Sequence, residues 1–279
     1  MHFSCGKFQL DLTTPCVMGI VNVTPDSFSD GGKFSQTNQA MAHALKLAEE
    51  GADILDIGGE STRPNATPVS LQQELDRVIP VIEGLVKQFK QVKQVNIPLS
   101  IDTYKPAVMK AAIDAGASIV NDVRALQEEG ALEIVAKSNA GVCLMHMQGT
   151  PQTMQNNPHY DDVVNDIKVF LKARLQASIH AGIEASRIVL DPGFGFGKTR
   201  EHNIRLIREL ESFAEFGQPL LVGLSRKSVL GQVTGNDVDT RLYASIAASV
   251  ISAMKGAKIL RVHDVKATVE ALKVVSAII

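Results

Sequence analysis

The sequence lacks the features that mark exported and membrane proteins. Its 279 residues include three cysteines, Cys5, Cys16 and Cys143, an odd number without CxxC spacing. This pattern argues against a disulfide framework and against a structural zinc site. No uninterrupted apolar run approaches the roughly 18 residues of a bilayer-spanning helix, and the first residues do not read as an export signal. We therefore expect a cytoplasmic protein without membrane association.

Charge of one sign is not in excess either. Lysine and arginine together number 28 and aspartate and glutamate 30, which gives a net charge of −2. A dedicated nucleic-acid-binding protein usually shows a basic excess or a basic stripe, so no nucleic-acid partner is expected. Hydrophobic residues make up 45% of the chain and charged residues 21%. This composition is typical of a globular protein and not of a disordered one.

Several common catalytic motifs are missing. The sequence has no His-x-x-x-His pair and no Gly-x-Ser-x-Gly elbow, which disfavours zinc and serine hydrolases. Residues 191–199 read DPGFGFGKT, but Pro192 stands where a nucleotide-binding P-loop needs its first glycine. The alternating glycines predict instead a backbone that a flat ligand can approach, with Phe194 or Phe196 available to stack on it. An ordinary glycine-rich turn remains the alternative.

Eight short apolar runs recur along the chain, with amphipathic stretches between them. Uniformly apolar runs indicate strands buried on both faces, and strand–helix alternation implies a parallel sheet. Eight units of about 35 residues each favour one (β/α)₈ barrel domain over residues 1–279 rather than an open doubly wound sheet. The predicted strands are Val17–Val23, Ile54–Ile57, Leu99–Ile101, Ser118–Val120, Gly141–Met145, Ile188–Leu190, Leu220–Gly223 and Lys258–Val262.

Local signals give several helix boundaries. Gln39–Glu50 has helical spacing of its apolar residues and stops at Gly51, and Ser70–Gln73 has the capping-box pattern. Pro106 is expected in the first turn of a third helix, and Tyr160–Ala181 reads as a long helix. The longest polar loops then follow the first two strands, at residues 24–38 and 61–70, and loops of this length are often functional lids.

Polar residues end most of the apolar runs. The ends of parallel strands meet at one face of a barrel, where chemistry is usually found. Any one of them could also be a helix-capping or core residue, and for His146 a structural role is the first expectation. The set comprises Asn22, Asp56, Asp102, Asn121, Asp122, His146, Asp191, Ser225, Arg226, Lys227, Arg261 and His263.

The charges in this set suggest a ligand with two parts. Arg63, Lys227 and Arg261 can reach the face, and guanidinium and ammonium groups suit an anion such as phosphate. The acidic residues Asp102 and Asp191 suit a heterocycle with several N–H donors, because a carboxylate can accept two parallel hydrogen bonds. The expected ligand is a nitrogen heterocycle that carries phosphate.

Long motifs resemble those of the dihydropteroate synthase family. Residues 18–32 read MGIVNVTPDSFSDGG and residues 53–64 read DILDIGGESTRP, which are similar to the first two signatures of that family. Shorter blocks match in the same order, and the resemblance runs from about residue 15 to residue 265. The shorter blocks are Ser100–Thr103, Asn121–Asp122, Asp191–Gly193, Ser225–Ser228 and Arg261–Val265.

The resemblance implies an enzyme of folate synthesis with the (β/α)₈ fold. Such enzymes join 6-hydroxymethyl-7,8-dihydropterin diphosphate to para-aminobenzoate, which gives 7,8-dihydropteroate and pyrophosphate. They use Mg²⁺, are usually homodimers and are the target of sulfonamides. For the dimer interface we expect residues 243–254, with ordinary core packing as the alternative. Two other functions remain open: a methyltetrahydrofolate-dependent methyltransferase and a non-catalytic pterin-binding regulatory barrel.

The family's site roles carry over to matching positions of this chain. Asp102, Lys227 and Asn22 would be catalytic, and Asn22 would also hold Mg²⁺. Asp102 would stabilise the cation that forms when the diphosphate leaves in an SN1-like substitution. Pterin contacts would come from Asp102, Asn121, Met145, Asp191, Phe196 and Lys227, diphosphate contacts from Thr62, Arg261 and His263, and the aminobenzoate pocket from Phe28, Arg63, Pro64 and Ser228.

Overall fold

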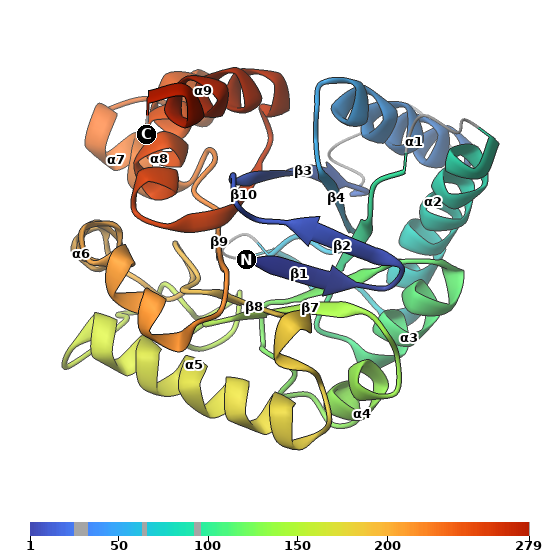
Figure 1. The fold of residues 1–279 in the computed structure, drawn as a ribbon, viewed down its shortest axis with the longest axis horizontal. Coiled ribbons are helices and arrows are strands. Elements are labelled where there is room, and N and C mark those ends of the chain that lie inside the picture. The colour runs from blue at the N-terminus through green and yellow to red at the C-terminus, as the bar shows by residue number, and fades with distance from the viewer. Residues whose placement is uncertain (25–32, 63–65, 92–95, 279) are drawn as a thin grey trace.

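A computed structural model describes residues 1–24, 33–62, 66–91 and 96–278. Among these residues, eight parallel strands close into a barrel in the order β10-β3-β4-β5-β6-β7-β8-β9, surrounded by helices (Figure 1). The predicted barrel is confirmed, and the open sheet is excluded. The strands are β3 (Cys16–Asn22), β4 (Ile54–Gly58), β5 (Leu99–Asp102), β6 (Ile119–Asp122), β7 (Gly141–Met145), β8 (Ile188–Asp191), β9 (Leu220–Val222) and β10 (Ala257–Val262).

The helices lie between successive barrel strands or, for the last one, after β10, and they form the outer ring (Figure 1). The 3₁₀ segments Ala185–Arg187 and Leu210–Phe216 precede β8 and β9, and Val238–Thr240 lies between α7 and α8. No helix within the described ranges is both long and apolar enough to cross a membrane. The helices are α1 (Lys33–Glu49), α2 (Leu71–Gln91), α3 (Pro106–Ala115), α4 (Ala131–Ala136), α5 (Val163–His180), α6 (Arg200–Arg208), α7 (Ser228–Thr234), α8 (Leu242–Met254) and α9 (Val265–Ile278).

Side-chain caps explain where α2 and α5 begin. The Ser70 hydroxyl accepts a hydrogen bond from the Gln73 N–H at 3.2 Å, and the Gln73 side chain accepts one from the Ser70 N–H at 3.1 Å. This is the predicted capping box of α2. Asp162 caps α5 through the N–H groups of Val164 and Asn165, so α5 begins at Val163 and not at Tyr160 as predicted.

The first predicted loop is shorter than the sequence suggested. Helix α1 begins at Lys33, whereas the expected helix began at Gln39 and the loop was expected to run to residue 38. Residues 33–38 read KFSQTN and have no clear apolar period, so their helical state was not visible. Residues 25–32, the middle of the predicted loop, lie outside the described residues.

A two-stranded hairpin before the barrel was not predicted. It consists of β1 (His2–Cys5) and β2 (Phe8–Asp11) and lies across one end of the barrel (Figure 1). Phe3 and Cys5 are buried against the N-terminal ends of the barrel strands, and a Cβ on Gly141 at the start of β7 would lie only 2.5 Å from the Phe3 ring. The hairpin closes the end of the barrel opposite the strand-end residues.

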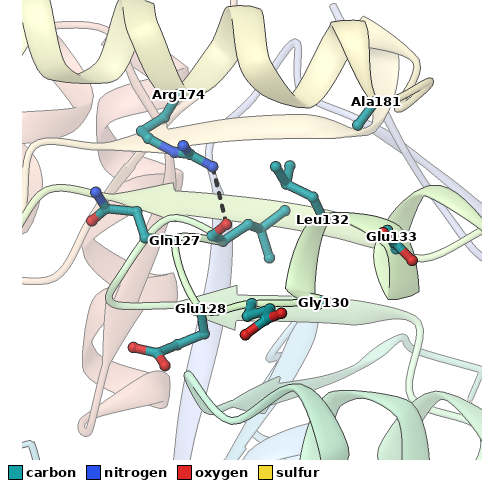
Figure 2. A pocket seen from close by; sticks show the side chains of 9 residues that line it. Gln127, Glu128, Gly130, Leu132, Glu133, Arg174 and Ala181 are labelled. Atoms are coloured by element: carbon teal, nitrogen blue, oxygen red, sulfur yellow. Dashed lines mark hydrogen bonds between the residues drawn. The ribbon is translucent and has the colours of Figure 1, made fainter.

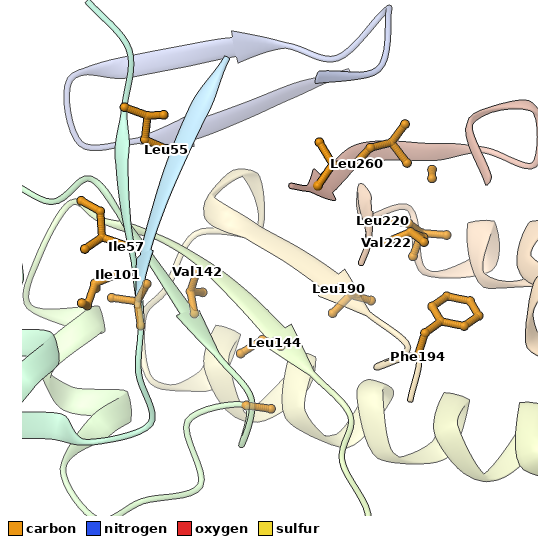
Figure 3. Close-up of a cluster of buried hydrophobic side chains, with 14 of the residues drawn as sticks. Leu55, Ile57, Ile101, Val142, Leu144, Leu190, Phe194, Leu220, Val222 and Leu260 are labelled. Atoms are coloured by element: carbon orange, nitrogen blue, oxygen red, sulfur yellow. The ribbon is translucent and has the colours of Figure 1, made fainter. Parts of the chain in front are cut away.

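Successive side chains along a barrel strand point alternately outward to the helices and inward to the barrel interior. In β4, Leu55 and Ile57 point outward to the helices, with Val142, Leu144 and Leu190 in the same buried cluster (Figure 3). Full burial of such a side chain contributes about 1.5–3 kcal/mol. The residue between them, Asp56, is also fully buried and faces the barrel interior. The apolar cluster therefore fixes which polar side chains point inward.

Candidate active site

The strand register brings the expected polar residues to one level. Asn22 of β3 pairs with Gly58 of β4, Gly58 with Asp102 of β5, and Asp102 with Asn121 of β6. Met145 of β7 pairs with Asp191 of β8 in the same way. These positions are the last residues of their strands, or the last but one for Asn121, so their side chains gather at the carboxyl-terminal face of the barrel, as the sequence predicted.

A pocket lies at this face. Its lining combines carboxylates and cations with aromatic and thioether side chains, which suits a flat polar heterocycle. Its free space is about 20 Å³, little more than one water molecule needs. The lining residues are Thr62, Asp102, Asn121, Val123, Met145, Asp191, Phe194, Phe196, Gly223, Lys227 and Arg261.

Arg261 joins two carboxylates at the floor of the pocket. Its Nε donates to Asp56 Oδ2 at 2.6 Å, and its Nη2 donates to Asp102 Oδ2 at 2.7 Å. Asn121 Nδ2 also donates to Asp56 Oδ2, at 3.1 Å. Asp56 Oδ1 and Asp102 Oδ1 are buried and have no hydrogen-bond partner among the described residues. Asp56, a strand-end residue without an expected ligand role, thus orients Arg261 and Asn121.

Burial changes the acidity of the pocket carboxylates. It raises the pKa of Asp102 to about 7, although the neighbouring Arg261 opposes this shift. It raises the pKa of Asp191 to about 6, opposed by the Gly193 N–H and by Lys227, Lys198 and Arg261. Burial lowers the pKa of the Arg261 guanidinium, but its two carboxylate partners outweigh that effect and leave the pKa above its ordinary value. Arg261 is therefore permanently charged, and its charge favours the ionised form of both carboxyls.

Lys227 lies over the aromatic face of Phe196. The ammonium nitrogen is 3.9 Å from the ring centroid, a favourable cation–π geometry. The Lys227 side chain also passes close to Gly195, where a Cβ would lie 3.2 Å from Cδ. Phe196 thus presents a flat face inside the pocket, and the Lys227 ammonium covers that face in this structure.

The other predicted residues lie around the pocket rather than in its lining. Ser225 Oγ lies 3.0 Å from His263 Nδ1 and accepts a hydrogen bond from the His263 backbone N–H at 3.2 Å. The hydroxyl can donate to a neutral Nδ1 or accept from an Nδ1–H, so this contact orients the ring in either tautomer. Ser228 is the first residue of α7 and is exposed. Phe28, Arg63 and Pro64 lie outside the described residues.

Several strand-end residues have structural roles. The Asp122 carboxylate accepts hydrogen bonds from the Arg124 and Leu126 N–H groups at 2.8 and 2.7 Å and so fixes a turn. Arg226 forms an ion pair with Asp264 at 2.7 Å. His146 is buried and packs edge-on against Phe170 with ring centroids 4.9 Å apart. For His146 the structural expectation from sequence holds.

Glu60 belongs to the second family motif, and the sequence alone did not indicate which residues it contacts. One carboxylate oxygen accepts the Val69 N–H at 3.2 Å, and the other pairs with Lys105, which also pairs with the buried Glu74. These contacts tie the segment that carries Thr62 to α2 and to the start of α3. The partners come from three separate elements, so no short motif contains them.

A second hollow of about 470 Å³ lies on the outer wall between α4 and α5 (Figure 2). Arg174 reaches into it from α5 and donates to the backbone oxygens of Ala125 and Leu126 at 2.8 and 3.0 Å. These bonds hold two buried residues with positive φ, +51° and +56°. The hollow is larger than the strand-end pocket, but the Arg174 guanidinium there is already hydrogen-bonded to the backbone. The chemistry-bearing side chains gather in the smaller pocket.

The buried cysteines offer no nucleophile. Cys143 is buried in β7, and burial raises the pKa of its thiol well above the ordinary value. Burial likewise raises the pKa of Cys5 and of Cys16 to about 12. A protonated, buried thiol is unreactive. None of the three cysteines is therefore suited to form a covalent intermediate.

The sequence matches a family model described as pterin binding enzyme over residues 18–263. It is also 50% identical over 269 residues to the dihydropteroate synthase of Escherichia coli (strain K12), a match that covers 96% of this chain and 93% of that protein. A relative from Neisseria meningitidis serogroup C, also a dihydropteroate synthase, is 52% identical over 276 residues, with 97% and 95% covered.

Solved structures of the same enzyme match the fold. Yersinia pestis dihydropteroate synthase in a sulfonamide drug complex has a TM-score of 0.92 and 50% identity, covering 99% of this chain and 98% of that one. The Xanthomonas albilineans enzyme with 4-aminobenzoic acid has a TM-score of 0.92 and 52% identity, with 99% and 97% covered. Its complex with 7,8-dihydropteroate has a TM-score of 0.89 and 49% identity, with 100% and 98% covered.

Proposed function

The chain belongs to the dihydropteroate synthases, a group within the pterin-binding enzymes, and from this premise we propose how its strand-end pocket performs the reaction. The protein is a transferase of folate synthesis that joins 6-hydroxymethyl-7,8-dihydropterin diphosphate to para-aminobenzoate. One observation carries the assignment to the pocket: Asp102, Asn121, Asp191 and Lys227 converge there around Phe196. No observation favours a methyltransferase or a regulatory barrel.

The pterin ring is proposed to lie on Phe196. Lys227 Nζ covers that face at 3.9 Å, so the ring would enter by displacing the ammonium to its own edge, where it can donate to a ring acceptor. The Asp191 and Asp102 carboxylates would accept the N–H groups of the pterin, and Asn121 would both donate and accept. Met145 and Val123, which belong to the same apolar cluster as Phe196, would supply further apolar contacts.

The diphosphate is proposed to lie beside Arg261. The guanidinium carries a permanent positive charge and is fixed by Asp56 and Asp102, so it needs no reorganisation when negative charge develops on the leaving group. His263 would add its Nε2 as a donor when that nitrogen is protonated, since Nδ1 faces Ser225. Thr62 would add a hydroxyl from the segment held by Glu60.

The end of β3 fits a Mg²⁺ ion that is held mainly by substrate. Protein-bound Mg²⁺ often takes one or two protein oxygens and completes its shell with phosphate oxygens and water. Among the residues that the structure describes, no group of three His, Cys, Asp or Glu could hold a metal by itself. A Cβ at Gly58 would lie 3.9 Å from Asn22 Oδ1 and 3.7 Å from Asp102 Oδ2, which places an amide oxygen beside the carboxylate. We propose Asn22 as the protein ligand; the bound ion would supply positive charge to the leaving diphosphate.

The substitution is proposed to be dissociative. The bond between the pterin methylene carbon and the diphosphate oxygen breaks first, and its electron pair leaves with pyrophosphate. The ionised Asp102 then stabilises the cation that remains on the pterin. The lone pair of the para-aminobenzoate amine attacks the methylene carbon and forms the C–N bond, and the nitrogen then releases one proton to water. An arylamine is nucleophilic without activation, which agrees with the inert cysteines.

The aminobenzoate pocket is proposed to form from the two loops at this face. Ser228, exposed at the first turn of α7, is suited to bind the carboxylate, because a helix N-terminus attracts anions. Phe28, Arg63 and Pro64 stay predictions for the rest of this pocket. Sulfonamides, which a Yersinia pestis relative binds, are expected to compete with para-aminobenzoate here.

A homodimer through α8 is the proposed assembly. Helix α8 packs its small residues, Ser245, Ala248, Ser249 and Ser252, inward. Its large apolar side chains face solvent: Tyr243 is 83% exposed and Met254 60%. An exposed apolar stripe on a helix is typical of a protein–protein interface. This arrangement supports the interface prediction for residues 243–254 over core packing.

The function is tested by mass detection of 7,8-dihydropteroate. The protein is mixed with the pterin diphosphate, para-aminobenzoate and Mg²⁺, and each component is omitted in turn. The proposal predicts product only in the complete mixture and inhibition by a sulfonamide. Pterin binding without turnover would instead support a regulatory barrel.

A further inference from the structure

The glycine-rich loop after β8 has an unusual backbone. Gly193, Gly195 and Gly197 have φ of +72°, +81° and +64°, so every second residue is left-handed. A Cβ on Gly193 would overlap the backbone oxygen of His146, and one on Gly197 would lie 2.6 Å from the backbone oxygen of Gln148. The loop therefore lies directly on the chain that follows β7. Its carbonyl groups belong to no helix or sheet and need other partners.

Lys198 is the hydrogen-bond donor for two of these carbonyl groups. Its Nζ donates to the backbone oxygens of Gly193 at 2.8 Å and of Phe196 at 2.9 Å, and it lies 3.0 Å from His146 Nδ1. The side chain is only 3% exposed, and it is not part of the pocket lining. The ammonium end thus ties both ends of the segment Gly193–Phe196 to one point behind the pocket.

The three contacts suit either protonation state of the lysine. Burial lowers the pKa of Lys198 to about 7 and, with the neighbouring Lys198 charge, that of His146 to about 2. As an ammonium, Lys198 donates to both carbonyls and to the neutral Nδ1. As an amine, it donates to the two carbonyls and accepts from an Nδ1–H. The loop therefore keeps its anchor across neutral pH.

Two further loop carbonyls are bonded by side chains from the β7–α5 connection. Gln155 Nε2 donates to the Gly195 oxygen at 2.6 Å, and the Tyr160 hydroxyl donates to the Gly197 oxygen at 2.8 Å. From α6, Asn203 accepts the Gly195 N–H at 2.7 Å. The two carbonyls that Lys198 binds belong to residues that shape the pocket. Phe196 presents its ring to Lys227, and the Gly193 N–H donates to Asp191 Oδ1 at 2.7 Å.

We infer that Lys198 is a positioning residue for the pterin: it fixes the backbone that places the Phe196 ring and the Asp191 carboxylate, without touching the substrate. The inference rests on the proposed function. It predicts that loss of the lysine weakens pterin binding far more than aminobenzoate binding, because the aminobenzoate loops do not contact this anchor within the described residues.

A matched control exists at the other end of the barrel. Arg187 is likewise a buried cation that ties backbone carbonyls: it donates to Ala140 O at 2.6 and 3.0 Å and to Val135 O at 2.8 Å. It precedes β8, whereas Lys198 follows it. Substitution of Arg187 therefore reports the stability cost of losing such an anchor, apart from any effect on the pocket.

The experiment compares Lys198→Met with Arg187→Met by steady-state kinetics and thermal unfolding. Lys198→Met is expected to raise KM for the pterin diphosphate by about tenfold or more and to leave KM for para-aminobenzoate within about twofold. Lys198→Gln, which keeps two N–H donors, should recover part of the loss. Arg187→Met should lower Tm and change neither KM.

Two results would overturn the inference. One is a folded Lys198→Met variant whose two KM values are unchanged or rise equally; the other is Arg187→Met with the same pterin-specific loss. If Lys198→Met does not fold, Lys198→Gln and Arg187→Gln are compared instead, and a smaller but still pterin-specific rise in KM is expected for Lys198→Gln because glutamine keeps two N–H donors. An unsubstituted protein that forms no dihydropteroate would contradict the proposed function instead, and direct titration of the variants with the dihydropterin alone would still test the anchor.

Discussion

At the residue scale, the pocket holds buried charge that function requires and folding disfavours. Asp102 and Asp191 are both buried, and burial raises both pKa values toward neutral pH. Arg261 is held by two carboxylates, and a guanidinium with such partners is expensive to leave unpaired. Substitution of a pocket carboxylate should therefore separate stability from activity, because the same charge affects them in opposite directions.

Asp191→Asn is expected to stabilise the protein at high pH while it weakens pterin binding. The folded-state pKa of Asp191, about 6, lies above the ordinary value of 3.8. Its contribution to stability is therefore fully present below pH 4 and is lost as the pH rises through 6, by about 3 kcal/mol. Asparagine does not ionise, so the variant does not lose this stability as the pH rises. Urea unfolding at pH 5 and pH 8 should show a larger gain at pH 8, and dihydropterin affinity should fall about tenfold or more.

The control for this pH effect is Asp161→Asn, whose side chain is 99% exposed. It should change neither unfolding nor affinity at either pH. Equal stability of Asp191→Asn and the unsubstituted protein at both pH values would contradict the buried-charge account of Asp191.

Asp102→Asn should lower the chemical rate far more than diphosphate affinity. The amide keeps the shape of the side chain but removes the negative charge that stabilises the pterin cation, for an expected loss of about 100-fold or more in single-turnover rate. Arg261 keeps its bond to Asp56, so inhibition by pyrophosphate should change by only a few fold. Comparable losses in rate and in pyrophosphate affinity would argue against this role for Asp102.

At the element scale, the sequence predicted every barrel strand and most residues of the pocket. Strands buried on both faces are uniformly apolar, and a polar residue at their end is easy to see, as with Asn22 or Asp191. The hairpin was missed because its strands have four residues each and precede the repeating pattern. Lys198 was noticed only within a failed P-loop motif, since its partners lie about 50 residues away or depend on the fold of the loop. Contacts of this kind leave no local pattern.

Gly193→Ala tests the close approach of the loop to the chain after β7. The substitution combines a φ of +72° with an overlap on the backbone oxygen of His146, and it should cost about 2–4 kcal/mol of unfolding free energy. Gly217→Ala is the matched control, because Gly217 has a φ of +68° but open space around it and should cost about 1 kcal/mol. If the two variants lose equal unfolding free energy in urea, the Gly193 backbone does not lie as close to the His146 oxygen as described.

At the scale of the whole molecule, the two ends of the barrel have different tasks. The hairpin and Arg187 close the amino-terminal end with apolar packing and backbone hydrogen bonds, whereas the other end carries the charges. In (β/α)₈ enzymes catalytic residues come from the carboxyl ends of several strands, and this chain follows that rule. The exposed apolar residues of α8 lie on the outer ring, so an assembly through them leaves the pocket open.

The dimer proposal predicts a mass of twice the 30.0 kDa of one chain. The double variant Tyr243→Asp, Met254→Lys should shift the protein toward the single-chain mass, because it places charge in the proposed interface. Val169→Asp on α5, where the side chain is 61% exposed, should leave the mass unchanged. Sedimentation velocity distinguishes these results, and a double variant with the mass of the unsubstituted protein would place the interface elsewhere.

The most direct test of the account is the rate of 7,8-dihydropteroate formation by the unsubstituted protein and by Lys227→Met. Lys227 contacts Phe196 inside the pocket and lies outside the hydrophobic core clusters, so its loss should leave the fold intact. The account predicts product from the unsubstituted protein and a rate about 100-fold or more lower in the variant. A folded Lys227→Met variant with undiminished rate would mean that the reaction takes place elsewhere on the molecule.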